Sequence, residues 1–311
     1  MEISSISVSS RGLVSRHSSE RLLLSTRYPI ISNFRFVSFS ATKSFGRPSS
    51  RPTGLLFQKE HHARPVCCQR SDAAPVLEAR SMDAIYDILA ERLLPKAAAA
   101  AQSSNSKHIV CLAGPPGAGK STVALEVLKR VNKLWSETER SHSIDPPEVA
   151  VVLPMDGFHL YRHQLDAMED PEEAHARRGA PWTFAPDLLL ECLRTLRSQG
   201  SVYVPSFDHG VGDPVENDIF VSVQHKVVIV EGNYLLLDEG VWKEISQVFD
   251  EKWFIDVDIE TSMQRVFGRH IATGKPPNVA KLRIDYNDRP NAELIIKSKK
   301  HADLIIKSVN I

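Results

Sequence analysis

Cysteine is scarce in this sequence, and the few residues present do not form a recognisable framework. Four occur in 311 residues, Cys67, Cys68, Cys111 and Cys192, and none forms a Cys-x-x-Cys pair. This pattern indicates neither a zinc site nor a disulfide framework. It is typical of a protein that works in a reducing compartment.

Long hydrophobic runs are also absent. No apolar stretch reaches the roughly 18 residues that a membrane-spanning helix needs, so we expect no membrane partner. With 42% hydrophobic and 24% charged residues, the composition is that of a globular protein. The length allows one large domain with extensions or two small domains.

Acidic residues are few in the amino-terminal part of the chain. Residues 1–70 contain three acids against eleven Lys and Arg, and they are rich in Ser. This composition is typical of an organelle transit peptide, and no apolar core of a secretory signal follows the first basic residues. We therefore predict a disordered transit peptide over residues 1–70, cleaved near Cys67–Arg70.

Two alternatives stay open for this segment. Its Ser content and the sequence PVCC favour the plastid (chloroplast stroma), whereas RGLVSRHSSERLLL could form an Arg-rich amphipathic helix of the mitochondrial type. A disordered regulatory tail is the other alternative.

The rest of the chain is acidic, with 27 of the 38 basic and 35 of the 38 acidic residues. A nucleic-acid binder needs a basic face that displaces counterions, so no nucleic-acid partner is expected. Within residues 71–106, Ser81 can cap an amphipathic helix whose apolar residues recur at helical spacing up to Leu93. The polar sequence SSNSK then links this helix to the body, residues 107–311.

The strongest motif lies at the start of the body. An apolar strand over residues 108–113 precedes GPPGAGKS, which matches G-x-x-x-x-G-K-[ST], and a helix follows from Thr122 to Val131. The backbone N–H groups of such a loop turn inward around a phosphate, and the helix N-terminus adds its positive dipole. Lys120 would reach the β- and γ-phosphates of a nucleoside triphosphate, and Ser121 would ligate Mg²⁺. The predicted nucleotide-binding residues are Gly114, Pro115, Pro116, Gly117, Ala118, Gly119, Lys120, Ser121 and Thr122.

Two apolar strands each end in an acid followed by glycine, in VAVVLPMDG and KVVIVEG. Ligands of a parallel sheet gather at the carboxyl ends of its strands. There Asp156 could contact Mg²⁺, accept a proton from an incoming hydroxyl, or do both. Glu231 would hold Mg²⁺ from the Walker-B position. The structural alternatives are an Asx turn at Asp156 and a helix N-cap at Glu231.

The signatures of other nucleotide-binding classes are missing. No N-K-x-D guanine motif and no L-S-G-G-Q occur, and the acid of the Walker-B strand is single, unlike the Asp-Glu pair of mechanical ATPases. These absences disfavour a GTPase, an ABC-type ATPase and a mechanical ATPase. A hydrolase must position water, whereas a kinase must exclude water and admit the hydroxyl of an acceptor.

Two stretches could hold such an acceptor, RRGAPWTFAPDLLLECL (177–193) and VYVPSFDHGVGDP (202–214). Aromatic side chains with a few polar groups on loops can bind a small metabolite. We expect Asp187 to cap a helix in the first stretch. Phe184 and Tyr203 could instead be core residues, and His209 could be a solvent-exposed loop residue.

Cations follow a predicted strand at 253–257. The next helix places Arg265 and Arg269 on one face, with His270 beside them. Such cations can close over a triphosphate and neutralise charge on the transferred phosphoryl group. Ordinary surface arginines are the alternative. HADLIIKS then predicts a closing strand.

Over residues 108–308 the sequence resembles the uridine kinase, phosphoribulokinase and pantothenate kinase group of P-loop kinases. GPPGAGKST, MDGFH, RRGAPWTF, VEGNYLLLD and HIATGK…DYNDRPNA are most similar to a bacterial and fungal branch labelled nucleoside or sugar kinase-like. The resemblance implies an α/β P-loop NTPase fold, with a parallel β-sheet flanked by helices on both faces and with lid and acceptor-loop insertions. It also implies ATP with Mg²⁺ and transfer to a primary hydroxyl.

The resemblance carries over to particular residues. It implies base and metal roles for Asp156, a Mg²⁺ role for Glu231, and lid roles for Arg265, which would contact the nucleotide, and for Arg269, which would be catalytic with Lys120. The substrate contacts that it implies are His159, Arg178, Phe207 and Asp208.

Two departures affect the acceptor side. Uridine kinases carry Asp-Ser-Phe-Tyr where this chain has Asp156-Gly-Phe-His159, and their Phe-Asp dipeptide is here Phe184-Ala185, with Asp187 two residues later. We therefore expect a small-molecule kinase whose acceptor is a nucleoside, a sugar or a pantothenate-like metabolite. The alternative is a nucleotide-binding regulator or slow ATPase that has no acceptor.

Overall fold

The computed structural model describes residues 74–139, 147–208 and 210–309. The predicted transit peptide, with Cys67 and Cys68, and the loop residue His209 lie outside these ranges. Within them, no helix has both the length and the apolar character that crossing a membrane requires.

A six-stranded sheet forms the centre of the body, and every neighbouring pair of strands is parallel. The strand order is β1-β8-β7-β2-β6-β3. The central strands are continuous apolar runs because helices cover both faces of the sheet. The strands are β1 Val76–Leu77, β2 His108–Ala113, β3 Ala150–Pro154, β6 Val227–Gly232, β7 Glu251–Asp256 and β8 Leu304–Lys307.

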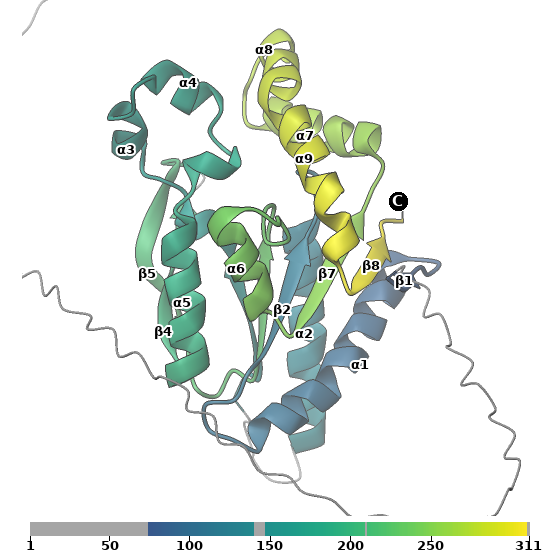
Figure 1. The fold of residues 1–311 in the computed structure, drawn as a ribbon. Coiled ribbons are helices and arrows are strands. Elements are labelled where there is room, and N and C mark those ends of the chain that lie inside the picture. The colour runs from purple at the N-terminus through teal and green to yellow at the C-terminus, as the bar shows by residue number, and fades with distance from the viewer. Residues whose placement is uncertain (1–73, 140–146, 209, 310–311) are drawn as a thin grey trace, which may run out of the picture. The chain divides into compact units, whose positions relative to one another are not determined.

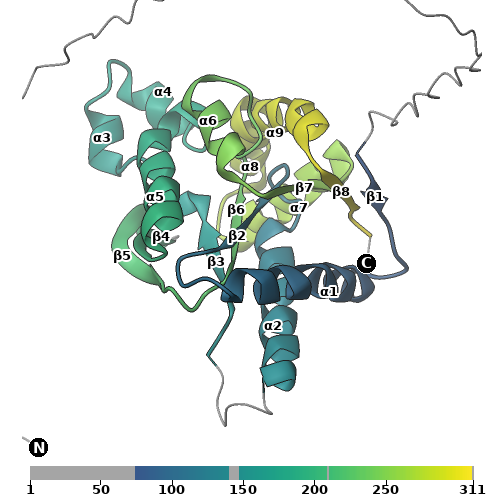
Figure 2. The same ribbon diagram turned by 60° about the horizontal axis from the view of Figure 1, so that its bottom comes forward.

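Helices lie on both faces of this sheet, as the sequence predicts (Figures 1 and 2). Alternate residues of β2 point into two separate cores. Val110 and Leu112 pack with α1 and α2, whereas Ile109 and Cys111 pack with α5, α6 and α9. These helices are α1 Met82–Ala101, α2 Lys120–Glu139, α5 Pro186–Gln199, α6 Gly240–Val248 and α9 Arg289–Lys297.

Helix α1 confirms the amphipathic helix that precedes the body. The Ser81 side chain accepts a hydrogen bond from the N–H of Ala84, which caps the first turn. Apolar side chains of the helix are buried against α2, and Arg130 of α2 pairs with Asp83 and Asp87 of α1.

The stretch 202–214, expected to be loop, forms most of a β-hairpin. Strands β4 (Val202–Asp208) and β5 (Asp213–Val221) pair antiparallel in a separate two-stranded sheet, with an irregularity between Val204 and Ser206. Tyr203 is 59% exposed, so the alternative of a core residue is wrong for it, whereas Phe184 is buried. Asp187 does not cap α5, because the helix begins at Pro186 and its N-cap is Ala185.

Short helical segments surround the carboxyl ends of the parallel strands. Figure 1 shows α3 and α4 on one side of this region and α7 and α8 on the other. The segments are η1 Met155–Phe158, α3 Arg162–Asp166, α4 Pro171–Ala176, η2 Pro181–Thr183, α7 Ile259–Ala272, α8 Pro277–Arg283 and η3 Ile284–Asp288. The short helix η4 Ser298–His301 lies instead at the amino end of β8.

Candidate active site

The predicted phosphate loop joins β2 to α2, and α2 begins at Lys120, two residues earlier than expected. Gly117 and Gly119 have φ values of 78° and 89°, a region that favours glycine. The ammonium Nζ of Lys120 donates to the carbonyl oxygens of Gly114 at 3.0 Å and Pro115 at 3.2 Å. An ammonium group has three N–H donors, so one remains for a ligand.

Ser121 and Glu231 meet at the first turn of α2. The Ser121 hydroxyl donates to Oε1 of Glu231 across 2.9 Å, and Glu231 is buried. Glu231 lies inside β6, in register with Leu112 of β2 and Pro154 of β3. The alternative of a helix N-cap is therefore wrong, and the structure joins the two residues predicted to hold Mg²⁺.

Asp156 lies in the 3₁₀ turn η1, directly after β3. Burial lowers the pKa of the Lys120 ammonium, and the charges of Glu231 and Asp156 act in the opposite direction. The two carboxylates therefore lie on the same side of the molecule as the phosphate loop. An Asx turn would require a backbone N–H group that donates to the Asp156 carboxylate, and none does so among the described residues.

Gly157 fixes this turn against the hairpin. A Cβ atom built on Gly157 would lie 2.0 Å from the carbonyl oxygen of Pro205, so only glycine allows this approach. Gly232, at the end of β6, is similarly close to Met155, at 2.4 Å from the Met155 Cβ atom. Both acids therefore stand beside a glycine that packing demands.

Helix α7 packs directly on the phosphate loop. The Ser262 hydroxyl donates to the carbonyl oxygen of Pro116, and Arg265 Nη1 donates to that of Gly117 at 3.4 Å. Arg269, one turn further, is exposed, and its charge lowers the pKa of Lys120. Both arginines are exposed, so the lid role and the alternative of ordinary surface arginines stay open for this pair. His270 is buried and turned to Asp288 instead.

Three of the four predicted substrate contacts form one cluster. The ring centroids of His159 and Phe207 are 4.6 Å apart, and the Arg178 guanidinium lies 5.6 Å from the Phe207 centroid. The ring of Phe184 lies on His159 at 3.9 Å. Because His159 Nδ1 is 2.8 Å from the carbonyl oxygen of Asp156, this cluster is tied to the turn that carries Asp156.

Asp208 does not join this cluster. Its carboxylate is exposed and accepts hydrogen bonds from the N–H groups of Gly210 at 2.7 Å and Val211 at 3.1 Å, so it closes the hairpin turn. Asp213, across the turn, is the acid that meets Arg178, at 3.3 Å.

Sequence reasoning missed Tyr234 and Asp213. Tyr234 follows the end of β6 at Gly232, and its buried hydroxyl donates to the carbonyl oxygen of Gly179. The only signal for either residue was its place next to a glycine-containing turn. Such a turn does not reveal a distant partner, and Gly179 is 55 residues away from Tyr234 in the chain.

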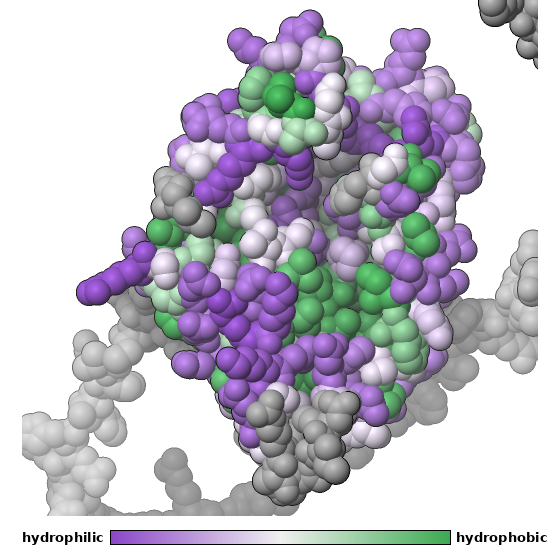
Figure 3. All heavy atoms as spheres, turned by 180° about the vertical axis from the view of Figure 1, so that it is seen from behind, coloured by the Kyte–Doolittle hydropathy of each residue, from purple (hydrophilic) through white to green (hydrophobic). Residues whose placement is uncertain are grey.

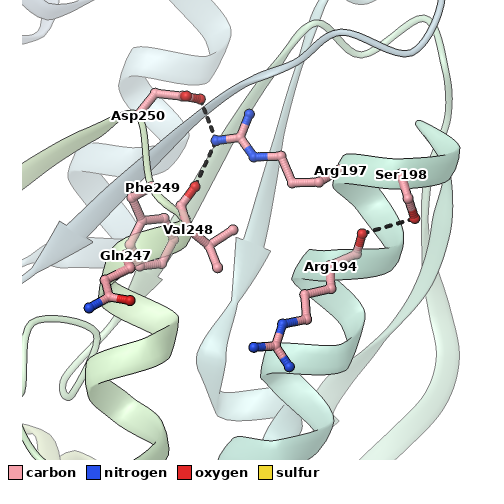
Figure 4. Close-up of a pocket in the computed structure, with 7 residues that line it drawn as sticks. All are labelled: Arg194, Arg197, Ser198, Gln247, Val248, Phe249 and Asp250. Carbon is pink, nitrogen blue, oxygen red and sulfur yellow. Dashed lines mark hydrogen bonds and ion pairs between the residues drawn. The ribbon is translucent and has the colours of Figure 1, made fainter. Parts of the chain in front are cut away.

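A pocket at the other end of the strands holds none of the predicted residues. Figure 4 shows Arg197 of α5 bonded to the Asp250 carboxylate and the Val248 carbonyl oxygen, just before β7 begins. Ligands of open parallel sheets bind at the carboxyl ends of the strands, so this pocket is not the active-site candidate.

From the side opposite to Figure 1, the surface is hollowed between two raised parts, and hydrophilic residues surround the hollow (Figure 3).

The chain is similar to a known protein family and to several known proteins. The model of the family described as "Phosphoribulokinase / Uridine kinase family" matches residues 109–311. A Schizosaccharomyces pombe protein named "Putative uridine kinase C227.14" is 35% identical over 207 residues, which cover 65% of this chain and 84% of that protein. The Escherichia coli protein "Uncharacterized protein YggC" is 35% identical over 212 residues, covering 67% and 82% of the two chains.

Solved structures agree on the fold. The crystal structure titled "putative fructose transport system kinase" from Silicibacter sp. TM1040 has a TM-score of 0.60 and 28% identity, covering 73% of this chain and 99% of that one. The Saccharomyces cerevisiae protein YFH7 has a TM-score of 0.61 at 21% identity, over the same shares of the two chains, which shows a common fold.

Proposed function

Because the chain belongs to the phosphoribulokinase / uridine kinase family, we propose that it is an ATP- and Mg²⁺-dependent kinase for a small molecule. The γ-phosphate would pass to a hydroxyl of a nucleoside, a sugar or a pantothenate-like metabolite. One observation carries the proposal. The phosphate loop, its Lys120 and the two carboxylates of Asp156 and Glu231 converge at the carboxyl ends of β2, β3 and β6.

Asp156 acts as the base in this proposal. As the bond between the acceptor oxygen and the γ-phosphorus forms, the bond from that phosphorus to the ADP oxygen breaks, and the hydroxyl proton passes to the Asp156 carboxylate. The bond from His159 to the Asp156 carbonyl oxygen holds the turn that aims this carboxylate.

Lys120 and the lid arginines bind the triphosphate. The third N–H of Lys120, beyond those bonded to Gly114 and Pro115, is available to the β- and γ-phosphates. Arg265 stays on the phosphate loop through Gly117, while Arg269 neutralises charge on the phosphoryl group in transfer.

The side chains present fit a magnesium ion. Among the described residues no group of three or more His, Cys, Asp or Glu could hold a metal by itself. Mg²⁺ usually keeps several waters and binds one or two carboxylates together with substrate phosphates. Ser121, Glu231 and Asp156 supply such a donor set, and the ion would withdraw charge from the phosphate oxygens.

The acceptor would contact His159, Arg178 and Phe207, with Asp208 acting through the hairpin turn.

Full-length protein incubated with ATP, Mg²⁺ and a metabolite library, read by mass spectrometry, tests the proposal. A new phosphorylated metabolite formed in step with ADP supports it.

A regulator or slow ATPase is the second candidate. It is favoured by Ala185, which stands at the N-cap of α5 where uridine kinases have an acid, and by Asp187, which is exposed in the first turn of that helix. ATP consumption with no phosphorylated metabolite in the same screen would favour this candidate and contradict the first.

We also propose a plastid location, with the mitochondrion as the alternative. The proposal rests on the composition of residues 1–70 alone.

A further inference from the structure

A five-residue π-helical turn, Ile284–Asp288, joins α8 to α9 without a break. Such turns are rare and occur frequently at functional sites. Its last two residues are polar and buried, since Asn287 is 2% exposed and Asp288 is 9% exposed. Buried polar side chains need partners, and these two find theirs on different sides of the active site.

Asp288 faces the nucleotide side. Its Oδ2 lies 2.8 Å from Nε2 of His270, a buried residue of α7. His270 follows Arg269 directly, and α7 is the helix that packs on the phosphate loop. The π-helical turn is therefore fixed to the helix that carries both lid arginines.

Asn287 faces the acceptor side and uses both ends of its amide. Nδ2 donates to the carbonyl oxygen of Arg178 at 3.0 Å, and Oδ1 accepts from Nε of Arg177 at 3.3 Å. Asn291, also buried, donates to the same Oδ1 at 3.0 Å. Arg283 adds a second bond to the carbonyl oxygen of Arg178, at 3.2 Å.

Asn287 holds the backbone of Arg178, and the Arg178 side chain belongs to the predicted acceptor cluster with His159 and Phe207. The Arg178 side chain donates to the carbonyl oxygen of Leu160 at 2.8 Å and covers the ring of Phe207. A shift of the Arg178 backbone would therefore move the guanidinium that faces Phe207.

We propose that Asn287 is a positioning residue, which holds the acceptor loop (residues 177–180) to the lid segment so that nucleotide bound under α7 also orders this loop. The proposal rests on the proposed kinase function. Two neighbouring residues of one π-helical turn bond to the two sides of the site, Asp288 to His270 of the lid helix and Asn287 to the acceptor loop. Their coupling needs no direct contact between ATP and Arg178.

Hydrogen exchange tests this coupling without knowledge of the acceptor. Exchange is followed in the peptide 177–183 of the full chain, with and without AMP-PNP and Mg²⁺. In wild type, nucleotide should slow exchange in this peptide. In Asn287→Ala with nucleotide bound, exchange there should be about tenfold faster than in wild type, equivalent to about 1.4 kcal/mol, while the Kd for AMP-PNP stays within about twofold.

Asn291→Ala is the matched control. It removes a buried Asn from the same network but leaves both bonds of Asn287 to the acceptor loop, so exchange in 177–183 should stay as in wild type. If Asn287→Ala does not fold, as judged by AMP-PNP binding, Asn287→Ser makes the same comparison with a milder change.

Unchanged exchange in the Asn287 variant, or an equal increase in Asn291→Ala, would overturn the proposal. A chain that binds AMP-PNP but phosphorylates no metabolite would remove the kinase function, and the exchange measurement would still report whether Asn287 couples the two segments.

Discussion

Gly117 and Ser262 touch through their backbones, although 145 positions separate them in the chain. A Cβ atom on Gly117 would lie 2.5 Å from the carbonyl oxygen of Ser262. The phosphate loop and helix α7 are thus in direct contact.

Gly117→Ala should destabilise the protein more than Gly119→Ala. Both glycines have positive φ, but a Cβ atom on Gly119 would meet nothing within 4 Å. The steric clash at Gly117 should cost roughly 1–3 kcal/mol beyond the backbone strain that the two variants share. Thermal unfolding of the nucleotide-free proteins measures the difference, and equal midpoints would show that the contact does not matter.

Asp156→Asn should slow phosphoryl transfer roughly 10²–10⁴-fold, because the amide cannot accept the hydroxyl proton. ATP binding should change little, since the phosphate loop is intact. Turnover on the acceptor found in the metabolite screen measures the effect. Asp187→Asn, at an exposed position on α5, is the control and should keep wild-type turnover. Full activity of Asp156→Asn would remove the assignment as base.

Glu231→Gln should raise the Mg²⁺ concentration needed for half-maximal activity by roughly 10–100-fold, because the proposed metal-binding carboxylate, which accepts a hydrogen bond from Ser121, loses its charge. Titration of Mg²⁺ at saturating ATP measures the shift. Excess Mg²⁺ should restore much of the activity, and a loss that no Mg²⁺ concentration repairs would contradict a role confined to the metal.

Glu251 should make stability depend on pH in the acid range. Burial alone would raise the pKa of this carboxyl, but the neighbouring His108, Trp253 and Arg92 outweigh it, with Arg92 Nε donating a hydrogen bond to Oε1, and lower the pKa from 4.5 to about 2. A depressed carboxyl pKa contributes stability that is full above 4.5 and is lost as the pH falls toward about 2.

Glu251→Gln should therefore cost about 1.5–3 kcal/mol at pH 7, the usual value of a hydrogen bond to a charged group. The difference from wild type should shrink as the pH falls from 4.5 toward about 2. Urea unfolding at pH 7, 4 and 3 measures it, and a difference that stays constant over this range would be the opposite result.

Removal of residues 1–70 should leave ATP affinity and the unfolding temperature unchanged, because a segment without apolar periodicity cannot offset the entropy of its own ordering. A chain that begins near Ser71 tests this by calorimetry. A reporter fused to residues 1–80 should enter plastids, and entry into mitochondria would change the location without touching the chemistry. Loss of ATP binding in the shortened chain would mean that the segment is structural.

The features predicted correctly are those written in contiguous sequence. The loop 114–121, the strand that ends in Glu231 and the helix that carries Arg265 each need only local periodicity and a motif. The parallel sheet with helices on both faces was implied by the family resemblance, whereas the edge strand β1 was not predicted.

The features missed depend on contacts between distant residues or on a competing local signal. The hairpin was hidden because its turn residues suggested a loop, and the exposed ring pair Tyr203–Phe220 forms only across two strands. Pro186 is favoured in the first turn of a helix, so α5 begins there, two residues before a helix capped by Asp187 would begin. The bond from Asn287 to Arg178 joins residues 109 positions apart, and no periodicity reports it.

The edge strand β1 is the first element that a pull from the amino-terminal side of the body would load. Only Val76 and Leu77 pair with β8, and the pairing is parallel. A translocation motor that drew in residues 1–70 would therefore load a two-residue pairing in shear first, then α1, and the buried central strands β2 and β6 last. Resistance to such a pull should come from the packing of α1 on α2 rather than from the sheet.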